Sequence, residues 1–285
     1  MFKKNMKKIV CGVLATASVA ACLGTFTACE TSHPEATITI EFNDTTYTLN
    51  YKLYRKIAPS TVNHFIWLAE NDYYTDLCIH DYDAGAKRMY TGAYTVDTDN
   101  ELTELDYFKI VSEHKNVGNF PHSVWDLTDA PTYTVYGEFE DNAFKVTNGA
   151  LKETYGSLTM YYHDKNIEDE VYVKKASNGD KTEREYRYNS ATSMFYISTV
   201  SSATKNSNYC TFATLEDSDD ELKALEDAIA DYIEDNYDGE EEDFVTSKTV
   251  AVDKYDPYVK SLGKTETFNL PNEPIIIKSV KITKY

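Results

Sequence analysis

Two neighbouring runs near the start of the chain alternate apolar and polar residues over strand-like lengths. Residues 37–42 and 47–53 each carry an apolar side chain at every second position, and Asn43-Asp44 lies between them. A period of two is typical of a strand with one buried face, and an Asn-Asp pair favours a tight turn. The chain is therefore expected to open with a β-hairpin, which commits it to a sheet with a buried face.

Two helices are expected among further short strands. Pro59 suits the first turn of a helix that ends at Asn71-Asp72, and Ser218 with Glu221 forms a capping box before a second amphipathic run. Strand-like runs recur along the chain at residues 76–80, 133–139, 156–162, 192–200, 209–215 and 275–282. Many short strands with only two clear helices predict a mostly β domain over residues 36–285, a closed antiparallel β-barrel with two helices at its ends.

Two stretches interrupt this pattern and are expected to be insertions. Residues 94–131 are acidic and irregular, and they are too long for an ordinary connection. Residues 163–188 contain two alternating arms around Ser177-Asn178-Gly179-Asp180, a sequence that favours a hairpin turn.

The first 29 residues predict an export signal rather than part of the domain. A basic start is followed by a weakly apolar run over residues 9–21, too polar for a membrane span. Cys22 and Cys29 each follow a lipobox-like triplet, a pattern that resembles a bacterial lipoprotein. Either cysteine would carry the lipid, and the expected location is outside the cytoplasm, anchored to the bacterial cell membrane. A plain secreted protein is the alternative.

Charge and composition limit the partners. The formal net charge is −19, and the N-terminal segment contributes lysines but no acidic residue, so the remainder is more acidic still. Such a charge argues against nucleic acid and against an anionic lipid surface as partners. The membrane would be reached through the N-terminal lipid alone.

Cysteines and histidines give no sign of a metal or cofactor site. Cys78 and Cys210 lie in apolar runs, which predicts two buried thiols, with a disulfide as the alternative in an oxidising compartment. The histidines are scattered, and no metal-site, nucleotide-binding or hydrolase motif is present. The expectation is no metal and no cofactor.

Several blocks, in order along the chain, resemble the cyclophilins, a family of peptidyl-prolyl cis-trans isomerases. The blocks are IAPSTVNHF at 57–65, YY at 73–74 with IH at 79–80, YTVYGEF at 133–139, GSLTM at 156–160, NSATSMFYI at 189–197, TFA at 211–213 and PIIIKSV at 274–280. They cover about half of the chain beyond the signal segment, and their order makes the resemblance specific. It implies the cyclophilin barrel and rotation about the X–Pro bond, whose barrier is ~18–20 kcal/mol.

The resemblance also shows which family residues have changed. In cyclophilins an arginine donates to the twisting amide, and polar side chains orient the carbonyls without a covalent step. Asp81 stands at the arginine position, Thr91 replaces one glutamine and Met194 replaces a second. Arg88 could reach the same pocket from a neighbouring strand, with an exposed surface arginine as the alternative.

The remaining substrate-binding positions are mixed. Tyr161-Tyr162 replace an alanine–asparagine pair and would fill space that a substrate needs, while Tyr209 replaces a histidine. His80, Met89 and Tyr196 keep the apolar and aromatic lining.

Two functions follow from these substitutions. The first is an isomerase homologue that acts on or binds proline-containing segments of exported proteins, with catalysis weak or lost. The second is a non-catalytic binding module for a surface protein or glycan on the cyclophilin scaffold. The 24 tyrosines fit such an interface, although packing within strands and core accounts for tyrosines equally well.

Overall fold

The computed structural model describes residues 33–113, 124–125, 133–142, 151–162, 170–174, 181–185, 191–205, 207–216, 220–251 and 265–285. The expected signal segment, with Cys22 and Cys29, lies outside these residues. Within them, no helix has both the length and the apolar character that a bilayer crossing requires.

The predicted opening hairpin is confirmed. Strands β1 (Glu35–Phe42) and β2 (Thr45–Leu53) pair antiparallel, with Phe42 opposite Thr45. Asn43 and Asp44 both have positive φ, 46° and 57°, as a two-residue hairpin turn requires. Alternate residues of both strands are buried, so the hairpin contributes one face to the core.

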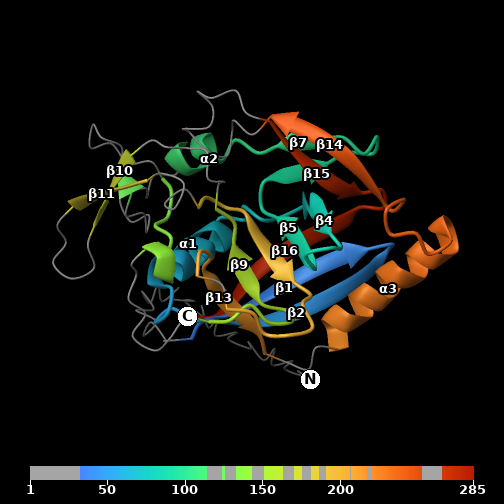
Figure 1. Ribbon diagram of the computed structural model, residues 1–285, viewed down its shortest axis with the longest axis horizontal. Helices are drawn as coiled ribbons and strands as arrows, with labels where there is room; N and C mark the ends of the chain where they lie inside the picture. The colour runs from blue at the N-terminus through green and yellow to red at the C-terminus, as the bar shows by residue number, and fades with distance from the viewer. Residues whose placement is uncertain are drawn as a thin grey trace, which may run out of the picture.

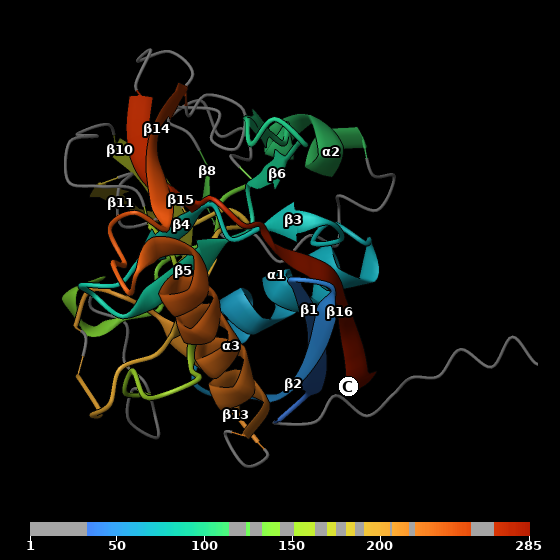
Figure 2. The ribbon, with the colours of Figure 1, turned by 90° about the vertical axis from the view of Figure 1, so that its right-hand side faces the viewer.

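The hairpin belongs to a nine-stranded sheet of order β3-β16-β1-β2-β13-β9-β12-β5-β4. Figures 1 and 2 show that this sheet is strongly curled. The expected mostly β fold is thus confirmed, but β3 and β4 remain separate edges and no described strand closes the barrel. The remaining members are β3 (Leu77–Cys78), β4 (Asp81–Asp83), β5 (Arg88–Thr91), β9 (Leu158–Met160), β12 (Phe195–Ser198), β13 (Thr211–Leu215) and β16 (Ile275–Lys284).

Both predicted helices are present, and the structure adds a third. Helix α1 (Pro59–Glu70) begins at its proline, and its buried Phe65 packs against rings of β12 and β13. Helix α3 (Asp220–Tyr237) lies along β2 (Figure 1), although Ser218 of the expected capping box is outside the described residues. The short helix α2 (Tyr107–Glu113) lies in the stretch expected to be irregular.

The first expected insertion contains more regular structure than the sequence indicated, and the second contains the two arms of its predicted hairpin. Strands β6 (Tyr94–Val96) and β7 (Leu102–Glu104) form a hairpin in the first, which also holds β8 (Val124–Trp125). In the second, β10 (Glu170–Lys174) and β11 (Lys181–Glu185) pair antiparallel as predicted, and residues 175–180, where the turn was expected, are not among the described residues.

One predicted strand is reduced to an isolated bridge. Residues 133–139 contribute a single pairing, Val135 with Ala191, before the short 3₁₀ helix η2 (Glu140–Asn142). Tyr133 has a positive φ of 59°, a conformation that an extended strand does not allow.

A two-stranded sheet near the C-terminus was not predicted. Strands β14 (Val245–Ala251) and β15 (Thr265–Pro271) pair antiparallel, and β15 lies against β4. In Figure 2 the pair rises above β4 and β5. Phe268 and Leu270 are buried and fix β15 to the rest of the fold.

The core is rich in aromatic rings, and both domain cysteines belong to it. Phe65 lies 5.2–5.6 Å, centroid to centroid, from the rings of Tyr74, Phe195 and Phe212. Cys78 and Cys210 are buried free thiols, so the first of the two expectations for them is confirmed. Burial raises the pKa of Cys78 to about 12, which keeps this thiol protonated and unreactive.

Candidate functional site

Asp81, at the position where the resemblance places an arginine, begins strand β4. Its Oδ1 accepts a hydrogen bond from the backbone N–H of Asn269 in β15, at 2.9 Å. Burial raises the pKa of Asp81 to about 6, and the nearby charges of Asp83 and Glu266 add to the effect, although the Asn269 N–H opposes it. Asp81 therefore satisfies an edge N–H of β15 and cannot donate to a substrate amide when it is ionised.

Arg88 of β5 does not project toward Asp81 as a free cation. Its Nε and Nη2 donate to the two oxygens of Glu153, at 3.0 and 2.9 Å, and its guanidinium lies 4.6 Å from the centre of the Tyr196 ring. Ser198 Oγ donates to Glu153 Oε1 at 3.1 Å. Burial alone would raise the pKa of Glu153, but the hydrogen bonds and charge of Arg88 outweigh it and lower that pKa. The positive charge of Arg88 is therefore balanced by the carboxylate of Glu153.

Four tyrosines form a connected group beside this ion pair on the outer face of β5, β9 and β12. Tyr90 lies 5.1 Å from Tyr196 and 5.9 Å from Tyr161, centroid to centroid, and Tyr209 lies 6.3 Å from Tyr196. Tyr196 is buried, whereas Tyr90, Tyr161 and Tyr209 are partly exposed. We call these four residues the tyrosine cluster.

Tyr161 and Tyr162, expected to occupy the substrate space together, point to different places. The hydroxyl of Tyr161 lies 3.4 Å from each carboxylate oxygen of Glu266 in β15. Tyr162 is buried in the core, where its ring lies 5.0 Å from that of Phe139. Tyr161 is thus the member of the pair that lies on the outer face, beneath β15.

Several other expected site residues lie within the core. Met89, Thr91 and Met194 are all buried, and Thr91 Oγ1 donates to the carbonyl of Cys78 at 2.8 Å. The structure therefore separates the predicted site into an outer group and an inner group. The outer group is Asp81, Arg88, Tyr161, Tyr196 and Tyr209, and the inner group is His80, Met89, Thr91, Tyr162 and Met194.

His80 is part of the core and not of an accessible site. Its ring lies 4.9 Å from Tyr94 and 4.8 Å from Phe268, and it is fully buried. Burial lowers the pKa of His80 to about 3, so the imidazole stays neutral in the folded protein.

Three residues that contact the predicted site were missed by the sequence reasoning. Glu153 is placed by a backbone bridge to Thr204, and Glu266 and Asn269 belong to the unpredicted strand β15. The alternation of Phe268 and Leu270 could have indicated β15. Nothing local in the sequence indicates Glu153 as the partner of Arg88.

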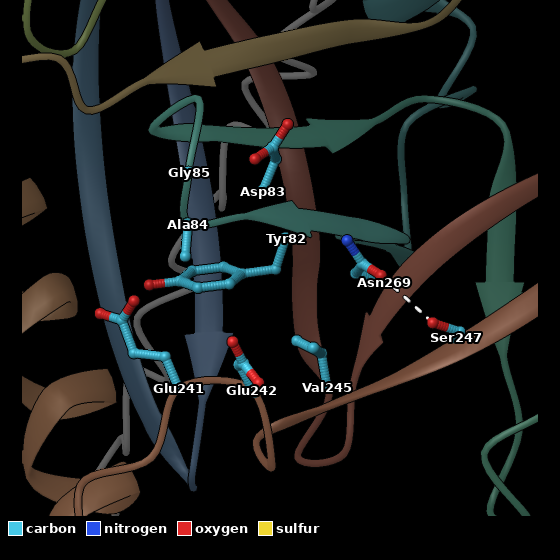
Figure 3. Close-up of a pocket in the computed structure, with 9 residues that line it drawn as sticks. All are labelled: Tyr82, Asp83, Ala84, Gly85, Glu241, Glu242, Val245, Ser247 and Asn269. Carbon is cyan, nitrogen blue, oxygen red and sulfur yellow. Dashed lines mark hydrogen bonds between the residues drawn. The ribbon is translucent and has the colours of Figure 1, made fainter.

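Beside Asp81 a pocket of about 470 Å³ opens between β4 and the β14–β15 pair. Figure 3 shows the Tyr82 ring within it, between the β4–β5 turn and the segment that carries Glu241 and Glu242. Asn269 lines the pocket with its side chain while its backbone N–H binds Asp81. The lining residues are Tyr82, Asp83, Ala84, Gly85, Glu241, Glu242, Val245, Ser247 and Asn269.

The described residues include no group of three or more His, Cys, Asp or Glu side chains placed to bind a metal ion. This holds for the pocket as well, because the carboxylates of Asp83, Glu241 and Glu242 do not converge on one point where a metal ion could bind.

A family model for the cyclophilin type peptidyl-prolyl cis-trans isomerases matches residues 37–250. The chain belongs to the cyclophilin family. The match spans the curled sheet apart from β16 and the first two residues of β1, and it includes every expected catalytic and substrate-binding residue. The resemblance drawn from the sequence blocks is therefore confirmed. A comparison with curated protein sequences gives no match.

Among solved structures the chain is similar to a cyclophilin type peptidyl-prolyl cis-trans isomerase of Cryptosporidium parvum. The two share 15% sequence identity over 89% of this chain and 99% of the other, with a TM-score of 0.42. A second structure of that protein, in the presence of the dipeptide Ala-Pro, shares 15% identity over 88% and 99%, also with a TM-score of 0.42.

Proposed function

We propose that this cyclophilin is a lipid-anchored, extracytoplasmic protein that binds proline-containing segments of exported polypeptides with little or no isomerase activity. Its scaffold is proposed to be the family's barrel, of which the described strands form the strongly curled sheet. The observation that carries the proposal is the hydrogen bond from Asn269 to Asp81 at the position of the family's arginine.

Asp81 makes catalysis of X–Pro rotation unfavourable. The twisted amide needs a donor at the prolyl nitrogen, and an ionised aspartate offers acceptors alone. Loss of one preorganised donor costs about 2.7–4 kcal/mol of transition-state stabilisation, or about 10²–10³-fold in rate. Arg88 is not placed to replace that donor, since its Nε and Nη2 bind Glu153 and hold the guanidinium over the Tyr196 ring.

The orienting side chains support the same conclusion. Thr91 and Met194, which stand in place of glutamines, are buried in the core. The Tyr161 hydroxyl is directed to Glu266 of β15, so β15 lies over the outer face that the family uses. With donor and orienting groups changed together, binding is the function that the remaining apolar and aromatic surface supports.

The anchoring part of the proposal rests on the sequence of residues 1–29. A lipid on Cys22 or Cys29 would hold an acidic domain near the membrane without requiring a charged lipid surface. Mass spectrometry of the N-terminal peptide from membranes would identify the modified cysteine, and an unlipidated N-terminus would overturn the anchor.

An isomerisation assay on the full chain, purified in mild detergent, tests the catalytic part. We expect no acceleration of Ala-Pro isomerisation over the uncatalysed rate, together with binding of the Ala-Pro peptide that its Ala-Ala counterpart lacks. Acceleration that Arg88→Ala removes would overturn the loss of catalysis. Equal binding of the two peptides would overturn proline recognition.

The tyrosine cluster favours one alternative, a non-catalytic binding module for a surface protein or glycan. Partly exposed tyrosine rings offer flat apolar area with hydroxyl groups at the edge, which suits both kinds of partner. Binding to a cell-surface glycan or protein that Tyr209→Ala abolishes, without any proline dependence, would favour this alternative.

A further inference from the structure

The pocket beside Asp81 is built largely by elements outside the sequence blocks that identify the family. Its walls are β4 with the β4–β5 turn, the segment after α3, and the β14–β15 pair. Its position differs from the outer face of β5, β9 and β12, where the tyrosine cluster lies. The pocket is therefore a feature separate from the tyrosine cluster.

Its position depends on the substituted catalytic residue. The Asp81 carboxylate binds the Asn269 N–H, and the Asn269 side chain, which accepts from Ser247 Oγ at 3.4 Å, forms part of the wall. Asp81 thus helps to position β15, the strand that forms one wall of the pocket. Asp81, which stands at the family's arginine position, therefore stabilises the wall of the pocket that Asn269 forms.

The chemistry of the lining is anionic and aromatic. Glu241 and Glu242 follow α3, and among the described residues neither has a basic partner within ion-pair distance. Asp83, on the β4 side, accepts the Ala86 N–H with its Oδ1 at 2.7 Å. The Tyr82 ring stands between these two parts of the wall, as Figure 3 shows, and Phe244 fixes it edge-on at 5.6 Å. Burial and the charge of Glu241 raise the pKa of Tyr82 to about 12, so its hydroxyl remains neutral.

An aromatic ring with carboxylates around it is the arrangement that binds an organic cation. The ring face attracts an ammonium or guanidinium group, and the carboxylates pair with its charge. A small metal ion would require oxygens converging at about 2–2.6 Å, and the lining does not provide such a group. The net charge of −19 also favours the approach of cationic partners.

We propose that this pocket binds a lysine or arginine side chain of a bound polypeptide. The side chain enters with its aliphatic stem beside Tyr82 and Val245, and its charged end lies beside Glu241 and Glu242. This recognition is separate from proline recognition, so a polypeptide with both features would contact two places on the protein.

The test is a comparison of two fluorescent peptides, identical except for one central lysine or norleucine and free of proline, titrated against the full chain in mild detergent. We expect the lysine peptide to bind about tenfold more tightly than the norleucine peptide, the size that one ring contact with one or two exposed ion pairs supplies. This preference should decrease as salt is raised, because the pairs are exposed.

Variants locate the effect. Glu241→Gln combined with Glu242→Gln should remove the lysine preference, and Tyr82→Leu should reduce it severalfold. Asp231→Asn combined with Asp235→Asn, on the exposed face of α3, removes the same charge from residues that do not line the pocket and should leave the preference unchanged. Thermal unfolding of each variant identifies any that fails to fold.

Three results would overturn the proposal. They are equal affinity for the two peptides, a lysine preference that survives the double substitution in the pocket, and a preference lost equally in the α3 variant, which would indicate a general charge effect. Because neither peptide contains proline, none of these results bears on the proposed proline recognition.

Discussion

Glu153 and Arg88 form a forked ion pair in which Nε donates to Oε1 at 3.0 Å and Nη2 donates to Oε2 at 2.9 Å. The side chain of Glu153 is 1% exposed and that of Arg88 is 21% exposed. The pair joins β5 to the segment before β9, so it links parts of the sheet that are far apart in sequence. Removal of either side chain would leave the charge of the other without a counterion, which destabilises the folded protein.

We expect Glu153→Gln to lower the free energy of unfolding by about 2–3 kcal/mol, because it leaves the Arg88 charge without its counterion in a half-buried place. Urea denaturation measures the loss. The exposed pair Lys223–Asp227 on α3 supplies the control, since Asp227→Asn should cost less than about 1 kcal/mol. Equal losses in the two variants would contradict a structural role for the buried pair.

Glu138 caps helix α1 from a distant part of the chain. Its Oε1 and Oε2 accept from the backbone N–H groups of Ser60 and Thr61, each at 2.9 Å, and no side chain within the helix start does so. Glu138→Ala would leave the buried N–H of Thr61 and the partly buried N–H of Ser60 without an acceptor, so we expect a loss of about 2–3 kcal/mol. Urea denaturation measures this loss, with Glu140→Ala, an exposed neighbour, as the control.

The sequence predicted those elements whose side chains follow a strong period. The alternation in β1 and β2, the proline at the start of α1 and the apolar face of α3 each identify an element without any tertiary information. Strand β14 has no such pattern, because its residues are mostly polar and exposed and its position depends on pairing with β15. The alternation of Phe268 and Leu270 is the one local sign of β15, and it does not indicate that this strand lies against Asp81.

The sequence indicated which residues to consider for the candidate site, but not which side chains and backbone groups they contact. Asp81 follows the IH block at 79–80, and Arg88 lies in a neighbouring strand, as one of the two expectations for it required. The partners Glu153 and Asn269 lie 65 and 188 residues away in sequence from the residues that they bind, and long-range pairing of this kind leaves no local pattern. The sequence therefore did not indicate that the charge of Arg88 is balanced by Glu153.

Gly92, which follows β5, lies where a side chain cannot fit. Its φ is +106°, and a Cβ would approach the Ser193 carbonyl oxygen to 2.4 Å and Met194 Cα to 2.9 Å. Gly92→Ala should therefore cost about 3 kcal/mol or more, from strain and backbone overlap together. At Gly85 a Cβ would meet Asp83 Oδ1 at an ordinary 3.4 Å, so Gly85→Ala serves as the control in thermal unfolding. Similar melting temperatures for the two variants would contradict the close approach.

His80 should make the protein sensitive to acid. Its pKa is lowered to about 3 in the folded protein by burial, below its ordinary value of 6.5, so the unfolded chain binds the proton more readily. Stability that is complete above pH 6.5 is then lost as pH falls toward 3, by up to about 1.4 kcal/mol per pH unit. His80→Phe keeps a ring between Tyr94 and Phe268 and should flatten urea midpoints between pH 6.5 and 4.5. An unchanged pH slope in this variant would contradict the buried neutral imidazole.

Asp81 predicts the opposite pH dependence, because its folded pKa of about 6 lies above the ordinary 3.8. The folded state binds the proton more tightly, so the stabilisation is present below pH 3.8 and is lost as pH rises through 6. Asp81→Asn keeps an oxygen for the Asn269 N–H and removes the charge. It should therefore match the wild type in stability at pH 4 and exceed it at pH 8, as measured by urea denaturation. Asp44→Asn, in an exposed turn whose positive φ asparagine tolerates, removes an equal charge elsewhere. If Asp81→Asn were instead less stable at pH 8, the ionised carboxylate itself would be what holds β15 in place.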